Sequence, residues 1–230
     1  MEDAHFLDTD FGGKGWTYGG IYDGHGGSFA ANYAARYLHQ RFLDLVRRGV
    51  TPGAAFAEVY QTISDELNAQ DSGTTAVDFL IRDGDIVTAN AGDGRAVVVG
   101  QRVVEQLTVD HRVDDEAERE RVERMGGQIV YPYVYRGVSG IMPTRTIGDP
   151  YFKPVGVIAT PSVSTHPISD DDLMLVAGCD GLFDFMSNED VAEFARRISE
   201  PVRLAEALRS EVLDARAGSD NITIICVLLH

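Results

Sequence analysis

The hydrophobic spacing of this chain changes period near Ser72, and that change limits the folds that the chain can form. Between residues 29 and 46, apolar side chains recur every three or four positions, which predicts an amphipathic helix that ends near Gly49. A second helix should follow at once, because Thr51 suits the N-cap and Pro52 suits the first helical position. From Ser72 onward, short runs rich in Val, Ile and Thr predict strands instead.

The strands after Ser72 are separated by turns that contain glycine, which is typical of an antiparallel meander. We expect these strands at residues 74–81, 85–91, 95–99 and 102–107. Their turns are Asp83-Gly84, Gly92-Asp93-Gly94 and Gly100-Gln101. The buried face of the second helix should carry core side chains, namely Phe56, Val59, Tyr60, Ile63 and Leu67.

The second half of the chain adds helices and strands on either side of one irregular segment. We expect helices at 113–125, 187–198 and 201–215, strands at 128–135, 173–177 and 221–229, and an irregular or mobile loop at 136–156. Ser187 and Asp190 resemble a variant capping box at the start of the middle helix. With no repeat and no linker, this order favours a single α+β domain over residues 1–230.

Composition excludes several classes of protein. The chain has 230 residues, 44% of them hydrophobic, which supports a folded core and argues against disorder. The formal net charge of −16 disfavours nucleic acid or an anionic membrane as a partner, and it reads most simply as an aid to solubility. No apolar run is long enough to span a bilayer. Cys179 and Cys226 lack metal-ligand spacing, and no secretory leader precedes them, so we expect a reducing cytoplasm.

Four carboxylates share one kind of position in the predicted elements. Asp23 and Asp180 each leave a strand, Asp220 enters one, and Asp93 sits in a predicted hairpin. Acids at strand ends can converge on a cation, and oxygen ligands without Cys or His suit Mg²⁺ or Mn²⁺ better than zinc. Each Asp-Gly pair taken alone reads as a plain turn, as at Asp83. Spacing therefore supports a metal site here without specifying its chemistry.

The motifs around these acids are more specific. Taken in order, they closely resemble those of the metal-dependent protein serine/threonine phosphatases, the type 2C or PPM family. They are Met1-Glu2-Asp3, Asp23-Gly24-His25-Gly26-Gly27, Ser72-Gly73-Thr74-Thr75-Ala76, Ala91-Gly92-Asp93-Gly94-Arg95, Leu107-Thr108-Val109-Asp110-His111-Arg112, Arg124-Met125-Gly126-Gly127, Thr144-Arg145-Thr146-Ile147-Gly148-Asp149, Cys179-Asp180-Gly181-Leu182-Phe183-Asp184 and Ser219-Asp220-Asn221-Ile222-Thr223. Asp-Gly-His-Gly-Gly and the last Asp-Asn are the most telling of them.

The resemblance implies both a fold and a ligand set. The expected fold is a four-layer α-β-β-α sandwich, with two central, mainly antiparallel sheets and a binuclear metal centre at one rim. The implied ligands of the two ions are Asp23 as the bridge, Asp180 and Asp220 for one ion, and Glu2, Asp3 and the carbonyl of Gly24 for the other, partly through waters.

The resemblance also reaches a third, weaker ion. Asp93 and Asp180 match the positions associated with it, and by the same resemblance Asp184 would assist them. By the same resemblance, Asp149 and Asp110 read as structural rather than catalytic positions.

The implied chemistry is hydrolysis without a covalent intermediate. Two cations roughly 3.5–4 Å apart can share a water or hydroxide, lower the water's pKa and neutralise charge on a phosphoryl group. Asp23 would hold the ions, and His25 would protonate the departing Ser or Thr alkoxide, although a purely structural His25 is the alternative. For His111, in a predicted loop between sheet and helix, we favour the structural interpretation.

One feature of the family pattern is absent from these residues. The family usually carries an Arg a few positions before Met-Glu-Asp that grips the substrate phosphate, in a first strand that here looks incomplete. A mis-assigned start or truncation, another phosphate anchor, and a weakened enzyme are the three explanations, and we prefer the first. Arg145 is the candidate substitute anchor, although its motif position normally supports structure.

We therefore expect a monomeric, cytoplasmic signalling enzyme that hydrolyses phosphoserine or phosphothreonine in phosphoprotein substrates with Mn²⁺ or Mg²⁺, two per site and a third more weakly. The main rival is a catalytically weak or silent phosphatase-like module that only binds a partner. A two-metal phosphodiesterase is less favoured, because such sites commonly use several His ligands and this set offers only His25.

Overall fold

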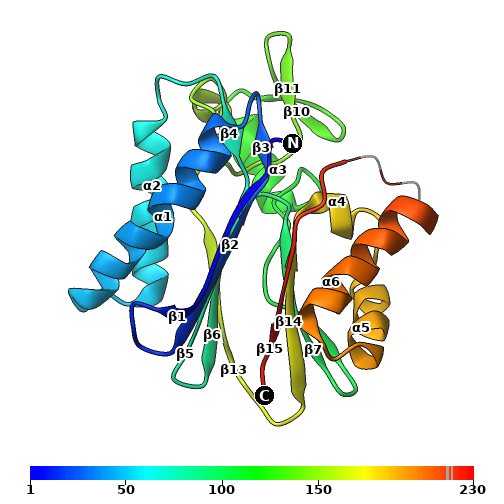
Figure 1. Ribbon diagram of the computed structural model, residues 1–230. Helices are drawn as coiled ribbons and strands as arrows, with labels where there is room; N and C mark the ends of the chain where they lie inside the picture. Colours follow the sequence, from blue (N-terminus) through cyan, green and yellow to red (C-terminus); the bar gives the residue numbers. More distant parts are fainter. Residues whose placement is uncertain (216–217, 219) are drawn as a thin grey trace.

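Two β-sheets lie face to face, and a pair of helices covers the outer side of each (Figure 1). The computed structural model describes residues 1–215, 218 and 220–230. The order of layers is therefore helix, sheet, sheet, helix, in an α+β chain whose strand pairs are antiparallel. No helix within these described residues is long and apolar enough to cross a membrane.

The first sheet has five strands in the order β1-β2-β5-β6-β13. They are β1 (Ala4–Phe11), β2 (Trp16–Tyr22), β5 (Ala76–Arg82), β6 (Asp85–Ala91) and β13 (Ser162–Pro167). The second sheet has four strands in the order β15-β14-β7-β8. They are β15 (Ile224–Leu228), β14 (Asp172–Gly178), β7 (Arg95–Gly100) and β8 (Val104–Gln106).

Successive side chains of a strand point to opposite faces of its sheet, so each strand contributes to two separate layers of the interior. On β5, Ala76 and Leu80 pack toward α1 (Phe29–Arg47) and α2 (Pro52–Glu66), whereas Val77 and Phe79 face the second sheet. All five predicted core residues of α2 and its end are buried, namely Phe56, Val59, Tyr60, Ile63 and Leu67.

The second sheet is covered by α5 (Asn188–Arg197) and α6 (Pro201–Ser210), which continues as a π-helical turn, Glu211–Ala215. The predicted capping box at the start of α5 is confirmed: the Ser187 hydroxyl accepts from the backbone N–H of Asp190, and the Asp190 carboxylate accepts from that of Ser187.

Short elements gather at one end of the sandwich, where the N-terminus also lies (Figure 1). They are β3 (Gly24–His25), β4 (Gly73–Thr74), β12 (Ile147–Gly148), α3 (Glu116–Arg124), β9 (Gln128–Val130), β10 (Tyr133–Arg136), β11 (Ser139–Ile141), a 3₁₀ turn at Lys153–Val155 and α4 (Asp180–Phe183). The first three strands form one small sheet, and β9, β10 and β11 form another.

The predicted meander is wrong at its middle turn. β5 and β6 pair in the first sheet, but β7 and β8 pair in the second, so Gly92-Asp93-Gly94 crosses between sheets rather than closing a hairpin. A tight crossing needs glycine here: the φ of Gly92 is 117°, and a Cβ on it would lie 2.5 Å from the Cβ of Thr75.

Two further predictions need correction. Residues 128–135 form a hairpin of β9 and β10 instead of one strand, because the Tyr131-Pro132 turn interrupts it. The segment 136–156 holds β11, β12 and the 3₁₀ turn, so it is not simply irregular. The sequence reading also missed β13, an edge strand whose residues alternate between half-buried and exposed and carry few apolar side chains.

Candidate metal centre

Asp23 leaves the end of β2 and is fixed by its own backbone. Its carbonyl oxygen accepts from the amide of Thr75 at 2.9 Å and from the hydroxyl of Thr74 at 2.9 Å. The chain then passes so close to the N-terminal segment that a Cβ on Gly24 would lie 2.4 Å from the carbonyl oxygen of Glu2. Glycine at position 24 therefore allows Glu2 and its neighbour to reach the acid at the strand end.

Asp180 begins α4, and only the N-cap residue Cys179 separates it from β14, so it comes from the second sheet. A Cβ on the next residue, Gly181, would lie only 2.0 Å from the carbonyl oxygen of Asn221. The glycine thus brings the segment holding Asp220 against Asp180. Ser219, the first residue of that last motif, lies outside the described residues.

The N-terminal acids are tied to the same place by hydrogen bonds. The Glu2 amide donates to Oδ1 of Asn221 at 3.1 Å, and the Glu2 carboxylate accepts from the amide of Gly27 at 3.1 Å. The Thr223 hydroxyl donates to Oδ2 of Asp3 at 2.6 Å. Residues from the two ends of the described chain therefore meet beside Asp23.

One cavity of about 470 Å³ opens beside Asp23 and Asp180. Six of the predicted site residues line it: Asp23, Gly24, His25, Asp93, Asp180 and Asp220. Glu2, Asp3 and Asp184 belong to the predicted set but do not line it. Its other wall comes from the hairpin region, including Tyr133, Ile141 and Met142. No Arg or Lys among the described residues lines it.

Burial and mutual repulsion dominate the electrostatics of the cavity. Burial, followed by the charge of Asp180, raises the pKa of Asp23 to about 9. Burial also raises the pKa of Asp180 and of Asp3 above the ordinary range. Burial and then the Asp180 charge raise the pKa of Asp93 to about 6, against the opposing effect of Arg112. Neighbouring carboxylates in this arrangement disfavour their own ionisation unless cations join them.

The donor atoms suit a hard divalent cation. Oδ1 of Asp3 and Oδ1 of Asp180 are buried, and neither has a hydrogen-bond partner within the described part of the chain. An oxygen of Asp23, an oxygen of Asp180 and Sγ of Cys179 lie within 4.8 Å of one another. Burial raises the pKa of the Cys179 thiol, and its sulfur already contacts the backbone of Asn221 and Thr223, so the carboxylates are the available ligands.

Arg112 was given no role by the sequence, yet it lies among three of the predicted acids. Its Nε donates to Oδ2 of Asp93 at 2.8 Å. Its Nη2 forms an ion pair with Oδ1 of Asp184 at 2.8 Å and lies 3.8 Å from Oδ2 of Asp180. The guanidinium therefore separates Asp93 from Asp184. The only signal in the sequence was its place in the Asp110-His111-Arg112 motif.

His25 is paired with Asp149, which the sequence reading took as structural. The two side chains line the same cavity, and Nε2 of His25 lies 2.7 Å from Oδ2 of Asp149. A Cβ on Gly73 would lie 1.9 Å from that carboxylate, so the glycine of Ser72-Gly73-Thr74 makes room for Asp149. Asp149 also has a φ of 52°, a conformation that few non-glycine residues adopt.

Arg145 is not placed as a substitute phosphate anchor. Its Nη2 lies 2.7 Å from Oε1 of Glu118, and its Nη1 donates to the carbonyl of Thr160. Its structural interpretation is therefore the one that the contacts favour. His111 is buried as well, and its Nε2 lies 2.8 Å from Oγ of Ser162.

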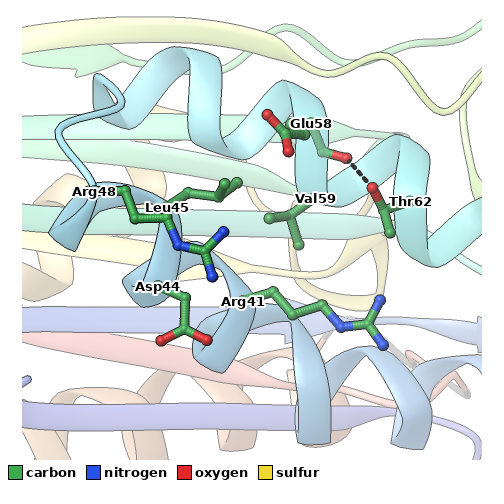
Figure 2. A pocket seen from close by; sticks show the side chains of 7 residues that line it. All are labelled: Arg41, Asp44, Leu45, Arg48, Glu58, Val59 and Thr62. Carbon is green, nitrogen blue, oxygen red and sulfur yellow. Dashed lines mark hydrogen bonds between the residues drawn. The ribbon is translucent and has the colours of Figure 1, made fainter.

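Another cavity, about 180 Å³ in volume, lies between α1 and α2 (Figure 2). Arg41, Asp44 and Arg48 line it from α1 and its end, and Glu58 and Thr62 line it from α2. Thr62 donates its hydroxyl to the Glu58 carbonyl within the helix. None of the acids of the larger cavity takes part in it.

Solved structures share this architecture. A Caenorhabditis elegans sex determining protein superposes with a TM-score of 0.86 at 24% identity, over 100% of this chain and 61% of that one. The serine-threonine phosphatase 2C from Toxoplasma gondii gives 0.80 at 22% identity, over 99% and 90%. At these identities the likeness establishes the fold alone.

Sequence comparison is more specific. A rice (Oryza sativa subsp. japonica) protein, "Probable protein phosphatase 2C member 13, mitochondrial", is 32% identical over 100% of this chain and 65% of its own length. The rice "Probable protein phosphatase 2C 6" is 34% identical over 77% of this chain and 43% of its own. "Protein phosphatase 2C homolog 1" of Saccharomyces cerevisiae is 30% identical over 100% and 88%. The chain thus spans about two fifths to two thirds of the two rice relatives.

The family model described as Protein phosphatase 2C matches residues 1–222, which include the strand-end acids and the motifs around them. The chain belongs to the protein phosphatase 2C family.

Proposed function

We propose that this chain hydrolyses phosphoserine and phosphothreonine in proteins, with Mn²⁺ or Mg²⁺ bound in the 470 Å³ cavity. The observation that carries the proposal is the convergence of Asp23, Asp180 and Asp220 on that cavity, from both sheets and the C-terminal segment. The partnerless buried oxygens of Asp3 and Asp180 support it, because a buried anionic oxygen without a partner is costly until a cation binds.

The ligand roles follow from where the residues lie. The charges of both Asp3 and Asp180 act on Asp23, which suits a bridge between two ions. Asp180 and Asp220 would hold one ion. Glu2, Asp3 and the carbonyl of Gly24 would hold the other, with Glu2 acting through water because its carboxylate already accepts from Gly27. A pair of such ions lowers the pKa of a shared water and offsets charge on a phosphoryl group.

His25 would supply the proton that the leaving alkoxide needs. It lines the cavity, and the carboxylate of Asp149 accepts from its Nε2, which orients the ring and favours the protonated imidazole, whose Nδ1–H would give that proton. Asp149 is thus a positioning residue for His25.

Family membership supports phosphoprotein substrates, and one wall of the cavity could contact them. Residues 139–143 and Tyr133 line that wall, where a peptide that carries the phosphate would contact them. Residues of the segment 136–156 are therefore the ones that we expect to select among phosphoproteins. Monomeric state, a signalling role and a cytoplasmic location stay predictions, and one rice relative is named as mitochondrial.

A silent binding module is the second candidate. It is favoured by one observation, the lack of Arg or Lys among the described residues that line the cavity. Without such a side chain, cations alone must attract and neutralise the substrate phosphate.

Phosphate release from a phosphothreonine peptide tests the proposal. We expect release with Mn²⁺ or Mg²⁺, none with EDTA, and a loss of roughly 10³-fold in Asp23→Asn, the scale of losing a key electrostatic contact in an active site. Asp83→Asn is the matched control, since Asp83 is also followed by glycine but lies in the turn between β5 and β6. Release that ignores EDTA or Asp23→Asn would contradict the proposal. A folded chain that binds metal but releases no phosphate supports the silent module.

A further inference from the structure

Arg112 provides a fixed positive charge where the family resemblance implies a third metal ion. The implied ligands of that ion are Asp93, Asp180 and Asp184. All three lie within 4.0 Å of the Arg112 guanidinium: two at 2.8 Å and the Asp180 oxygen at 3.8 Å. The cationic side chain and the ion would therefore need the same carboxylate oxygens.

We infer that Arg112 takes the place of the third ion, so that this chain binds two divalent cations rather than three. The inference rests on the proposed function for its two-ion centre. Arginine stays protonated at all ordinary pH values, so this charge cannot be removed by a chelator or by low metal concentration. It also cannot act as an ion that comes and goes with the substrate.

The contacts of Asp180 explain how one ion and one guanidinium can share a single acid. Oδ2 of Asp180 faces Nη2 of Arg112, while Oδ1 is buried and has no hydrogen-bond partner in the described ranges. One oxygen thus faces the arginine, and the other remains available to a metal ion. Arg112 positions Asp180 as well as replacing an ion.

Asp93 is the acid most fully committed to the arginine. Its side chain is 3% exposed, and its Oδ2 accepts directly from Nε of Arg112. Releasing this carboxylate to an ion would leave a largely buried guanidinium without its main partner, which is costly. An added ion must therefore overcome an existing buried ion pair before it gains its own contacts.

Counting bound Mn²⁺ tests the inference without substrate. Metal-stripped protein is titrated with Mn²⁺, and free Mn²⁺ is measured by its electron paramagnetic resonance signal. We expect two ions on the unaltered chain up to millimolar Mn²⁺. In Arg112→Gln we expect a third, weaker ion, and Asp93→Asn in that background should remove it again.

Arg95→Gln is the matched control for loss of an arginine charge at this rim. Arg95 pairs with Asp110 and Asn188 and contacts none of the three acids, so two ions should still bind to it. Asp184→Asn in the otherwise unaltered chain should also keep two ions, because Asp184 binds the arginine and not a metal.

Each result decides the matter. Three ions on the unaltered chain, or loss of one ion in Asp184→Asn, would overturn the inference even if Arg112→Gln does not fold. A folded Arg112→Gln that still binds only two ions would overturn it as well. Binding of no Mn²⁺ at all would instead remove the proposed function.

Discussion

Two neighbouring regions of the fold contain carboxylates with opposite surroundings: one is supplied with hydrogen-bond donors, and the other is surrounded by further acids. Asp78, in the middle of β5, is fully buried and accepts hydrogen bonds from three tyrosine hydroxyls: Tyr18 and Tyr22 at 2.6 Å each and Tyr60 at 2.7 Å. Asp23 follows Tyr22 directly, yet its neighbours are other acids and its pKa is raised to about 9, mainly by burial.

The difference shows how β2 can contribute to both stability and function, since it carries Tyr18 and Tyr22 and leads into Asp23. At Asp78 every carboxylate oxygen has donors, so the group holds β2, β5 and α2 together. Burial raises its pKa to about 6, and the three tyrosine hydroxyls oppose that rise. At the rim, oxygens of Asp3 and Asp180 have no hydrogen-bond partner among the residues described. Hydroxyl donors satisfy the carboxylate of the first region, whereas in the second region, by our proposal, cations take that role.

Alanine substitutions should separate the two regions most strongly. Asp78→Ala leaves three buried hydroxyls without their acceptor, so we expect the free energy of unfolding to fall by about 4 kcal/mol. Asp23→Ala in EDTA should change it by no more than about 1 kcal/mol, since relief of repulsion offsets lost contacts. Urea unfolding of both variants in EDTA measures this. Equal losses would break the comparison.

Added metal should act on one region alone. Mn²⁺ at about 100 times its dissociation constant should raise the free energy of unfolding by about 2.7 kcal/mol per ion. The rise should be preserved in Asp78→Ala and reduced to less than half in Asp23→Ala. Thermal unfolding with Mn²⁺ or EDTA gives the shift, and an equal response in both variants would contradict the assignment.

The Asp149 contact with His25 should matter for some substrates only. Asp149→Asn should lower kcat about 30-fold on a phosphothreonine peptide, because the ring that protonates the alkoxide loses its support. On p-nitrophenyl phosphate the loss should be below about 3-fold, since a phenolate needs no proton to leave. Steady-state kinetics on both substrates decide this. Equal losses would reduce Asp149 to a structural role.

The smallest effect concerns His111, another buried group with satisfied partners. Burial, then the charge of Arg145, lowers its pKa from 6.5 to about 4, while Glu118 opposes and Arg121 adds to the effect. The folded state therefore binds fewer protons than the unfolded state between these values, and stability falls as pH drops below about 6.5.

Between pH 7 and pH 5 we expect His111 to cost about 1–2 kcal/mol. Asp78 changes stability in the opposite direction, since its pKa is raised, so the comparison must be with a variant. Urea unfolding at both pH values should show a smaller fall in His111→Gln. An unchanged fall in that variant would show that His111 is not the group responsible.

Local patterns in the sequence predicted the local structure well. The helical period gave α1 and α2, and the capping box marked the start of α5. What spacing could not give was the partner of each strand: the turn at Asp93 looks like any hairpin turn, but the strands on either side join different sheets. Strand pairing depends on packing between distant segments, which a local pattern does not carry.

The candidate site shows the same contrast between what the sequence predicted and what it did not. Motif resemblance named the acids, and the structure brings Asp23, Asp180 and Asp220 to one cavity. The motif resemblance did not indicate that Arg112 lies among these acids or that Asp149 supports His25. The residues in those two contacts are 19 and 124 positions apart in the sequence. Asp78 was missed for a similar reason, since its three tyrosines come from β2 and α2.

The crossing at Gly92-Asp93-Gly94 has a mechanical consequence. Asp23 follows a strand of one sheet and Asp180 follows a strand of the other, so the cation that we propose between them would join the two sheets at one end. Arg112 is bonded to Asp93, which lies in the crossing itself. This ion pair is a permanent link next to the removable link that the cation would form. Chelation should therefore loosen the seam between the sheets at this end while the opposite end stays closed.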